Sequence, residues 1–136
     1  MGPFSRLRPG CRLGPDSKAG SFVEMKKTIV GRGSKVPHLS YMGDTEIGED
    51  ANVGAGSITC NYDGENKYQT RIGDRAFIGS DTMMVAPVNI GDDAVTGAGS
   101  VISEDVPDGS LAIERTKQKI ITDYRKTRKG KKAGGK

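Results

Sequence analysis

The most constraining feature of this sequence is an apolar residue that returns every six positions between residues 47 and 107. A period of six fits neither an amphipathic helix, which repeats near 3.6, nor a single strand, which alternates at 2. The apolar slots are filled by Ile47, Val53, Ile72, Ile78, Met84, Ile90 and Ile102, and Thr59 and Thr96 take two more. Such a period is typical of a repeat architecture, in which each six-residue unit forms one side of a coil.

The positions around each slot repeat as well. Glycine usually follows the slot, at positions 48, 54, 73, 79, 91 and 97. Four places after the slot the residue is small or β-branched: Ala51, Ser57, Ala76, Thr82, Val88, Ala94, Ser100 and Val106. We expect the slot residue to point inward, the glycine to permit the turn and the small residue to fill the corner. The pattern therefore predicts an all-β parallel β-helix with triangular rungs of about 18 residues.

The frame can be followed backward from Ile47 through Met42, Val36 and Val30, and then from Met25 to Leu7, with two five-residue steps. It is interrupted once, between Thr59 and Ile72, where the excess residues have turn chemistry. Insertions in solenoids become loops on one face. We therefore predict a protruding loop around residues 60–71 that folds over a groove.

The frame stops after Pro107, and we divide the chain into a β-helix domain, residues 1–114, and a basic tail, residues 115–136. Residues 1–114 carry a net charge of −5, whereas residues 115–136 carry +9. Ile120, Ile121 and Tyr124 have roughly helical spacing, so a short helix is expected between residues 115 and 128, followed by a disordered end. Although a basic tail can attract nucleic acid, a membrane or an anionic cofactor, we favour a solvated tail.

Two cysteines, Cys11 and Cys60, make no disulfide framework. The sequence shows no signal peptide and no apolar run long enough to span a bilayer, so a reduced, cytoplasmic protein is expected. The first rung begins almost at once, without a polar cap. We expect either a fragment of a longer polypeptide or a partner that covers this rung.

His38 is the only histidine. A lone histidine is more often structural or simply exposed than catalytic. Equivalent positions on successive rungs form a column along the β-helix, and the column of His38 continues with Ala55, Ser80 and Ala98. This arrangement favours a catalytic role for His38. A proton acceptor at the foot of a ladder of small residues suits a narrow groove for an extended ligand, in which a backbone N–H could face a developing oxyanion.

A second column is basic. Arg8 and Lys26 are 18 residues apart, and each directly follows an inward residue. Two adjacent cations suit a phosphate group, Arg by its planar fork and Lys as a point charge. The alternative is that both are ordinary solvated charges.

Four strings, residues 2–10, 22–27, 38–44 and 52–64, together resemble the acetyltransferase half of the bacterial bifunctional N-acetylglucosamine-1-phosphate uridyltransferase/glucosamine-1-phosphate acetyltransferase family. The resemblance covers residues 2 to about 115. It implies a left-handed β-helix that assembles as a homotrimer with shared active sites. It also implies acetyl-CoA as co-substrate, glucosamine-1-phosphate as acceptor, and a role in UDP-N-acetylglucosamine and cell-wall synthesis.

The resemblance also implies roles for individual residues. The sugar phosphate would be bound by Arg8, Lys26, Tyr41, Asn52 and Lys67. Acetyl-CoA would be held by Ala55, Asn61, Tyr62, Ser80, Ala98 and Arg115. His38 would act as general base when the amine attacks the thioester, a backbone N–H near Ala55 would steady the oxyanion, and Glu24 would orient His38.

The sequence also sets limits. The uridyltransferase half, with its glycine-rich loop and Mg²⁺ site, is absent from these 136 residues. A lone histidine gives no ligand cluster, so we expect no metal, and we read Cys60 as a bystander beside the coenzyme. Nucleic-acid binding and membrane insertion are not expected. Two alternatives remain open: a hexapeptide acyltransferase with another acceptor, and an inactive trimeric scaffold.

Overall fold

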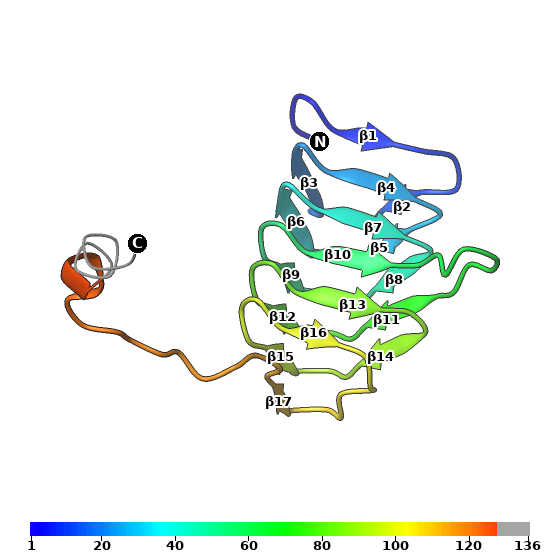
Figure 1. Cartoon of the computed structure of the whole chain (residues 1–136). Coiled ribbons are helices and arrows are strands. Elements are labelled where there is room, and N and C mark those ends of the chain that lie inside the picture. Colours follow the sequence, from blue (N-terminus) through cyan, green and yellow to red (C-terminus); the bar gives the residue numbers. More distant parts are fainter. Residues whose placement is uncertain (128–136) are drawn as a thin grey trace.

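The structure, a computed structural model, describes residues 1–127 and is a single coil of short strands (Figure 1). Three parallel sheets form the three sides of the coil. The first contains β1 (Arg6–Leu7), β4 (Glu24–Lys26), β7 (Tyr41–Gly43), β10 (Ile58–Cys60), β13 (Met83–Val85) and β16 (Val101–Ile102). The second contains β2 (Arg12–Leu13), β5 (Ile29–Val30), β8 (Thr45–Ile47), β11 (Thr70–Ile72) and β14 (Val88–Ile90). The third contains β3 (Lys18–Ser21), β6 (Lys35–His38), β9 (Asn52–Val53), β12 (Phe77–Ile78), β15 (Val95–Thr96) and β17 (Leu111–Ala112).

The predicted fold class is confirmed, including its hand. In Figure 1 the near strands β4, β7 and β10 run left to right while the coil descends, and the chain returns behind them. That sense of rotation is left-handed, which the usual preference for right-handed crossovers between parallel strands does not favour. The register shows the spacing of the rungs: Leu7 pairs with Met25, and Met25 pairs with Met42.

The core is a thin column of the residues that occupy the six-residue slots. Met25, Val36, Met42, Val53, Ile78 and Met84 are fully buried, and Ile47, Ile72 and Ile90 nearly so. The threonines at the slots, Thr59 and Thr96, are buried as well. Each strand is only two to four residues long, so the stacking of identical positions from rung to rung supplies the packing.

Small hydroxyl residues fill several corners, and the hydroxyls of Thr28 and Ser34 have hydrogen-bond partners there, whereas the buried hydroxyl of Thr70 has none among the described residues. The Thr28 hydroxyl donates to the Lys26 and Met42 carbonyl oxygens, at 2.9 Å each. Ser34 donates to Gly48 and accepts from the Ala51 N–H at 2.9 Å. Buried hydroxyls with such partners stabilise the corner, where an unsatisfied one would cost free energy.

Glycine after the slot is required where two rungs approach closely. A Cβ on Gly54 would lie 2.6 Å from the Ser80 nitrogen and 2.7 Å from the Ile78 oxygen. Both contacts are with backbone of the next rung, which cannot move aside without breaking the ladder. The glycine column therefore permits the close approach of successive rungs.

The interruption between Thr59 and Ile72 forms the predicted loop, a small hairpin that protrudes from the coil in Figure 1. Tyr62 and Lys67 form an antiparallel bridge, and the Tyr68 N–H donates to the Asn61 carbonyl oxygen at 2.8 Å. The Asp63 carboxylate closes the turn by accepting from the Glu65 and Asn66 N–H groups. We call residues 61–68 the hairpin.

The expected short C-terminal helix is confirmed: helix is found at 124–127, whereas residues 113–121 have no regular structure. The coil continues past Pro107, where the six-residue frame ends, because β17 adds a further strand that pairs with β15. Ile120, Ile121 and Tyr124 are exposed, so no apolar surface supports a longer helix. The expected disordered end lies outside the described residues. No helix within residues 1–127 is long and apolar enough to cross a membrane.

Candidate functional site

The first part of the candidate site is the predicted column of His38, Ala55, Ser80 and Ala98, which we call the ladder. It lies at the corner where the third sheet turns into the first. Equivalent backbone hydrogen bonds join its rungs: Gly56 donates to His38 at 3.3 Å, Asp81 to Ala55 at 2.8 Å, and Gly99 to Ser80 at 2.8 Å. His38 itself pairs in register with Ser21 on the rung before. The insertion between β10 and β11 therefore leaves this column unbroken.

His38 is exposed, and its surroundings on one chain are simple. The Ser40 hydroxyl donates to the His38 carbonyl oxygen at 2.8 Å and so fixes the backbone at the corner. Glu24, predicted to orient His38, instead lies 3.8 Å from Arg6 and 3.5 Å from Arg8. Among the described hydrogen bonds and ion pairs, none joins Glu24 to His38.

Arg115 joins the far end of the ladder to the start of the tail. Its guanidinium donates to the Ala98 carbonyl oxygen at 2.7 Å. The neighbouring Glu114 N–H donates to the Ser100 hydroxyl at 3.1 Å. The chain is therefore still tied to the coil where the tail begins, and the ladder carries a positive charge at its end.

The second part of the candidate site lies at the other corner of the first sheet, and we call it the basic cluster: Lys26, Tyr41, Asp44, Asn61 and Lys67. The Asp44 carboxylate accepts from the Asn61 amide at 2.8 Å and pairs with the Lys26 ammonium at 3.4 Å. The Asn61 amide also reaches the Tyr41 hydroxyl, at 3.4 Å. Lys26 is only 8 % exposed, so these contacts hold a nearly buried cation.

Lys67 brings a second cation from the hairpin to the basic cluster. Its contact with the Lys26 ammonium is the main cause that lowers the pKa of Lys67. The pKa of Lys26 is raised, first by its contact with Lys67 and also by the Asp44 carboxylate, although burial opposes the change. Of the two ammonium groups, Lys67 therefore loses its proton more easily. A cavity of about 390 Å³ beside them is lined by Lys27, Asp44, Lys67, Tyr68 and Gln69.

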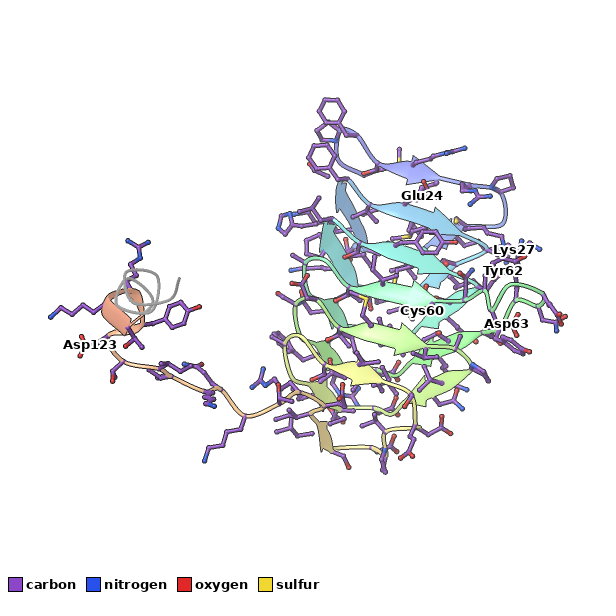
Figure 2. The ribbon with its side chains drawn as sticks, viewed as in Figure 1. Glu24, Lys27, Cys60, Tyr62, Asp63 and Asp123 are labelled. Atoms are coloured by element: carbon purple, nitrogen blue, oxygen red, sulfur yellow. The ribbon has the colours of Figure 1, made fainter. Side chains whose placement is uncertain are left out.

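The structure does not bring every predicted site residue together on one chain. Asn52 begins β9 on the third sheet and pairs with Lys35 and Phe77, away from the basic cluster. Asn61, predicted to bind the coenzyme, lies with Tyr41 in the basic cluster. Tyr62 is 59 % exposed on the hairpin (Figure 2), where its hydroxyl donates to the Gly64 carbonyl oxygen.

Arg8 lies one rung from Lys26, as the 18-residue spacing predicted. The evidence is a hydrogen bond from the Arg8 N–H to the carbonyl oxygen of Met25, the neighbour of Lys26. Its guanidinium nevertheless pairs with Glu24, whereas Lys26 pairs with Asp44. The two cations therefore each have a carboxylate partner within the chain.

Sequence reasoning gave no role to Asp44, which the structure places at the centre of the basic cluster. A signal was present, because Asp44 follows Lys26 by 18 residues. The five-residue step in the frame shifts the register by one residue, so that Lys26 pairs with Gly43 and Asp44 comes one residue later. A count of 18 residues alone therefore did not identify Asp44 as the partner of Lys26.

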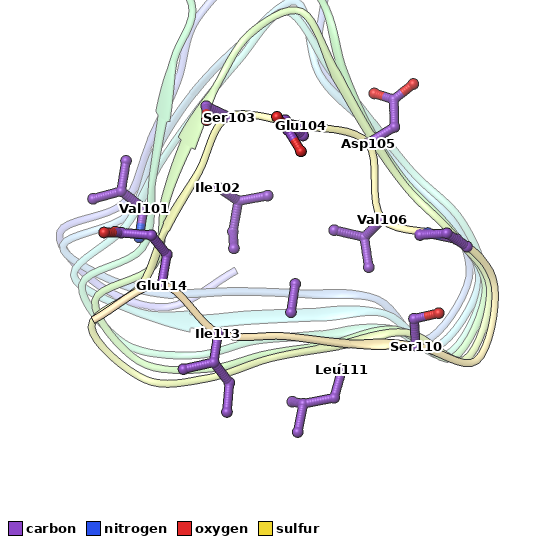
Figure 3. Close-up of a pocket in the computed structure, with 12 residues that line it drawn as sticks. Val101, Ile102, Ser103, Glu104, Asp105, Val106, Ser110, Leu111, Ile113 and Glu114 are labelled. Atoms are coloured by element: carbon purple, nitrogen blue, oxygen red, sulfur yellow. The ribbon is translucent and has the colours of Figure 1, made fainter. Parts of the chain in front are cut away.

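A larger hollow, of about 520 Å³, lies at the C-terminal end of the coil (Figure 3). Ile102 and Val106 point toward the centre of the triangular coil in this view, so the hollow is the open end of the core column, and none of the predicted site residues lines it. Within residues 1–127, no group of three or more His, Cys, Asp and Glu side chains could hold a metal ion.

The six-residue repeat and the coil that it forms can be compared with known families and structures. The family described as "Hexapeptide repeat of succinyl-transferase" matches residues 69–104. The chain is 60 % identical over 124 residues to the bifunctional protein GlmU of Heliobacterium modesticaldum, covering 91 % of this chain, and 61 % identical over 121 residues to that of Syntrophomonas wolfei, covering 89 %. It spans 27 % of the length of each relative. The resemblance to the acetyltransferase half of the bifunctional family is therefore confirmed.

Solved structures with the same fold include acetyltransferases from other organisms. A mutant perosamine N-acetyltransferase from Caulobacter crescentus, in complex with CoA and GDP-perosamine, superimposes with a TM-score of 0.73 and 25 % identity, covering 86 % of this chain and 55 % of that one. The acetyltransferase domain of PglB from Neisseria gonorrhoeae, in complex with acetyl coenzyme A, gives a TM-score of 0.75 and 20 % identity, covering 87 % and 55 %.

Proposed function

We propose that this chain transfers the acetyl group of acetyl-CoA to the amine of glucosamine-1-phosphate and so serves UDP-N-acetylglucosamine and cell-wall synthesis. The observation that carries the proposal is the position of His38 at one end of the ladder, with the basic cluster at the opposite corner of the same sheet. One corner offers a proton acceptor beside a row of small residues, and the other offers cations for a phosphate group.

The ladder suits an extended coenzyme. Ala55, Ser80 and Ala98 carry short side chains and are spaced by one rung, which leaves a strip without bulky groups. Arg115 at its end provides a positive charge for the phosphates of a coenzyme. Relatives of this fold are described in complex with CoA or acetyl coenzyme A, which supports the choice of acyl donor.

In the proposed reaction the neutral amine attacks the thioester carbonyl carbon and forms a C–N bond. His38 accepts the proton that the amine loses, and a backbone N–H near Ala55 steadies the oxyanion of the tetrahedral intermediate. Collapse of the intermediate breaks the C–S bond and releases the CoA thiolate. A base contributes roughly 10²–10⁴-fold, so positioning of the two substrates supplies much of the acceleration.

The basic cluster and Arg8 would bind the sugar phosphate. Asn52 lies on the third sheet, where its register partners are Lys35 and Phe77 and not residues of the basic cluster. We therefore propose a homotrimer in the cytoplasm in which neighbouring chains complete each site, so that Asn52, Tyr62 and Glu24 act across the interface. Within the described chain, Glu24 pairs with Arg6 and Arg8. If Glu24 orients a His38 side chain, that histidine therefore belongs to a neighbouring chain of the trimer.

The test measures free thiol release from acetyl-CoA with glucosamine-1-phosphate, for the chain as given and for His38→Ala. We expect activity that falls by at least about 100-fold in His38→Ala, with Lys35→Ala on the same strand as the control. Because His38 is exposed, its removal should leave thermal stability unchanged. An active protein that prefers unphosphorylated glucosamine or another amine would favour a different hexapeptide acyltransferase, and transfer to no acceptor would favour a scaffold.

A further inference from the structure

Asp44 lies at a corner of the coil, where it pairs with Lys26 at 3.4 Å and lines the same cavity as Lys67. Its backbone is in the left-handed region (φ 49°), and its N–H donates to the Lys26 carbonyl oxygen at 2.8 Å. That geometry fixes the side chain next to Lys26, and the Asn61 amide holds the carboxylate from the other side at 2.8 Å. Aspartate and asparagine tolerate this backbone conformation better than most residues do.

The charges around Asp44 would repel one another without it. Lys26 comes from β4, Lys67 from the hairpin and Lys27 from the corner after β4; the Tyr41 hydroxyl faces the same space from β7. Two close ammonium groups disfavour each other's charged form, whereas a nearby carboxylate favours both. Asp44 is the carboxylate that acts on both Lys26 and Lys67.

We propose that Asp44 is a positioning residue of the acceptor site, whose carboxylate balances the charge of Lys26 and Lys67 and so presents two cations side by side to the phosphate group. The phosphate part of this inference rests on the proposed function. Asp44 acts through the two lysines, and it also holds Asn61, whose amide lies over Gly43 and leaves no room there for a Cβ.

The first experiment reads the lysines directly, without substrate. Protein labelled with ¹³C at lysine Cε is titrated by NMR for wild type, Asp44→Asn and the control Asp50→Asn, which changes another corner aspartate with positive φ (54°). Lys67→Gln identifies the Lys67 signal. Asp44→Asn should move the Lys67 titration toward lower pH by about half to one unit, and Asp50→Asn should not. Asp44→Gly, which also accepts positive φ, should repeat the effect if the asparagine variant fails to fold.

The second experiment compares the KM for glucosamine-1-phosphate at pH 7.0 and 9.5. At pH 7.0 the Asp44→Asn variant keeps more of the Lys67 charge than at pH 9.5, so the rise in its KM for glucosamine-1-phosphate should be the smaller of the two. At pH 9.5 the variant has lost more of the Lys67 charge than wild type has. The KM for glucosamine-1-phosphate of Asp44→Asn, divided by that of wild type, should therefore be about threefold higher at pH 9.5 than at pH 7.0, while the KM for acetyl-CoA stays unchanged.

An unchanged Lys67 titration in Asp44→Asn and Asp44→Gly would overturn the proposal, as would a KM that rises equally at both pH values, since that result indicates a structural role alone. If the titration moves but no acetyl transfer is detected in wild type, the balancing role of Asp44 stands and the proposed function fails. Inorganic phosphate, titrated at the same two pH values, then serves as the probe of the anion site.

Discussion

The Arg115 guanidinium donates to the Ala98 carbonyl oxygen at 2.7 Å, which ties the first residue of the tail to the last small residue of the ladder. The two residues are 17 positions apart in the chain, so the contact spans one rung. It holds an exposed cation at the end of the strip that we assign to the coenzyme.

Replacing Arg115 by Ala should therefore weaken coenzyme binding. A hydrogen bond to a charged group contributes about 1.5–3 kcal/mol, so the KM for acetyl-CoA should rise roughly 10- to 100-fold, with little change in the KM for the sugar phosphate. Lys117→Ala, which removes a nearby tail charge, is the matched control. Equal effects of both variants on acetyl-CoA would show that only the net charge of the tail matters.

Replacing Lys26 by Met should impair the acceptor side. The aliphatic stem is kept, whereas the nearly buried charge is lost and Asp44 retains its bond with Asn61. Steady-state kinetics should show a KM for glucosamine-1-phosphate raised by about tenfold or more, and the KM for acetyl-CoA unchanged. The exposed Lys18, on the third sheet, provides the control as Lys18→Met. A sugar-phosphate KM that stays at the wild-type value would remove Lys26 from the acceptor site.

Replacing Gly54 by Ala should destabilise the coil. The new Cβ would overlap the Ser80 nitrogen and the Ile78 oxygen of the next rung. Overpacking of this kind costs about 1–3 kcal/mol in the free energy of unfolding, which denaturant melts can measure. Gly2→Ala meets its nearest atoms at 3.5 Å, an ordinary contact, and should leave stability nearly unchanged. Equal melts for the two variants would contradict the close approach of the rungs.

The turn of the hairpin should depend on pH through Asp63. Hydrogen bonds from the Asn66 and Glu65 N–H groups lower the pKa of its carboxyl. A lowered pKa in the folded state means that the stabilisation is present above the unfolded value, near 4, and is lost as pH falls through the folded value. Asp63→Ala should therefore speed amide exchange at Glu65 and Asn66 at pH 6. At a pH well below the folded pKa, variant and wild type should converge, and a difference that persists there would exclude the carboxylate as the cause.

Part of the candidate site could be predicted from the sequence because the repeat makes distance along the chain equivalent to position in space. His38, Ala55, Ser80 and Ala98 fall in one column as soon as the slips in the frame are counted, and the structure shows that column. Arg8 and Lys26 are adjacent for the same reason. The partners of these cations could not be predicted, because Glu24 and Asp44 reach them by side-chain conformation and corner geometry rather than by spacing.

The sequence alone determined the fold class, the inward residues and the site of the hairpin, since a six-residue period with glycine after the slot has few other three-dimensional solutions. The tertiary structure decided that Asn61 and Lys67 return from the hairpin to Asp44 and Lys26, and that Asn52 stands apart on another sheet. The contacts of Asn61 and Lys67 depend on where the hairpin folds back, and the place of Asn52 depends on which way each corner turns. A periodic pattern predicts neither the path of the hairpin nor the direction of a corner, because both are set by contacts between residues outside the repeat.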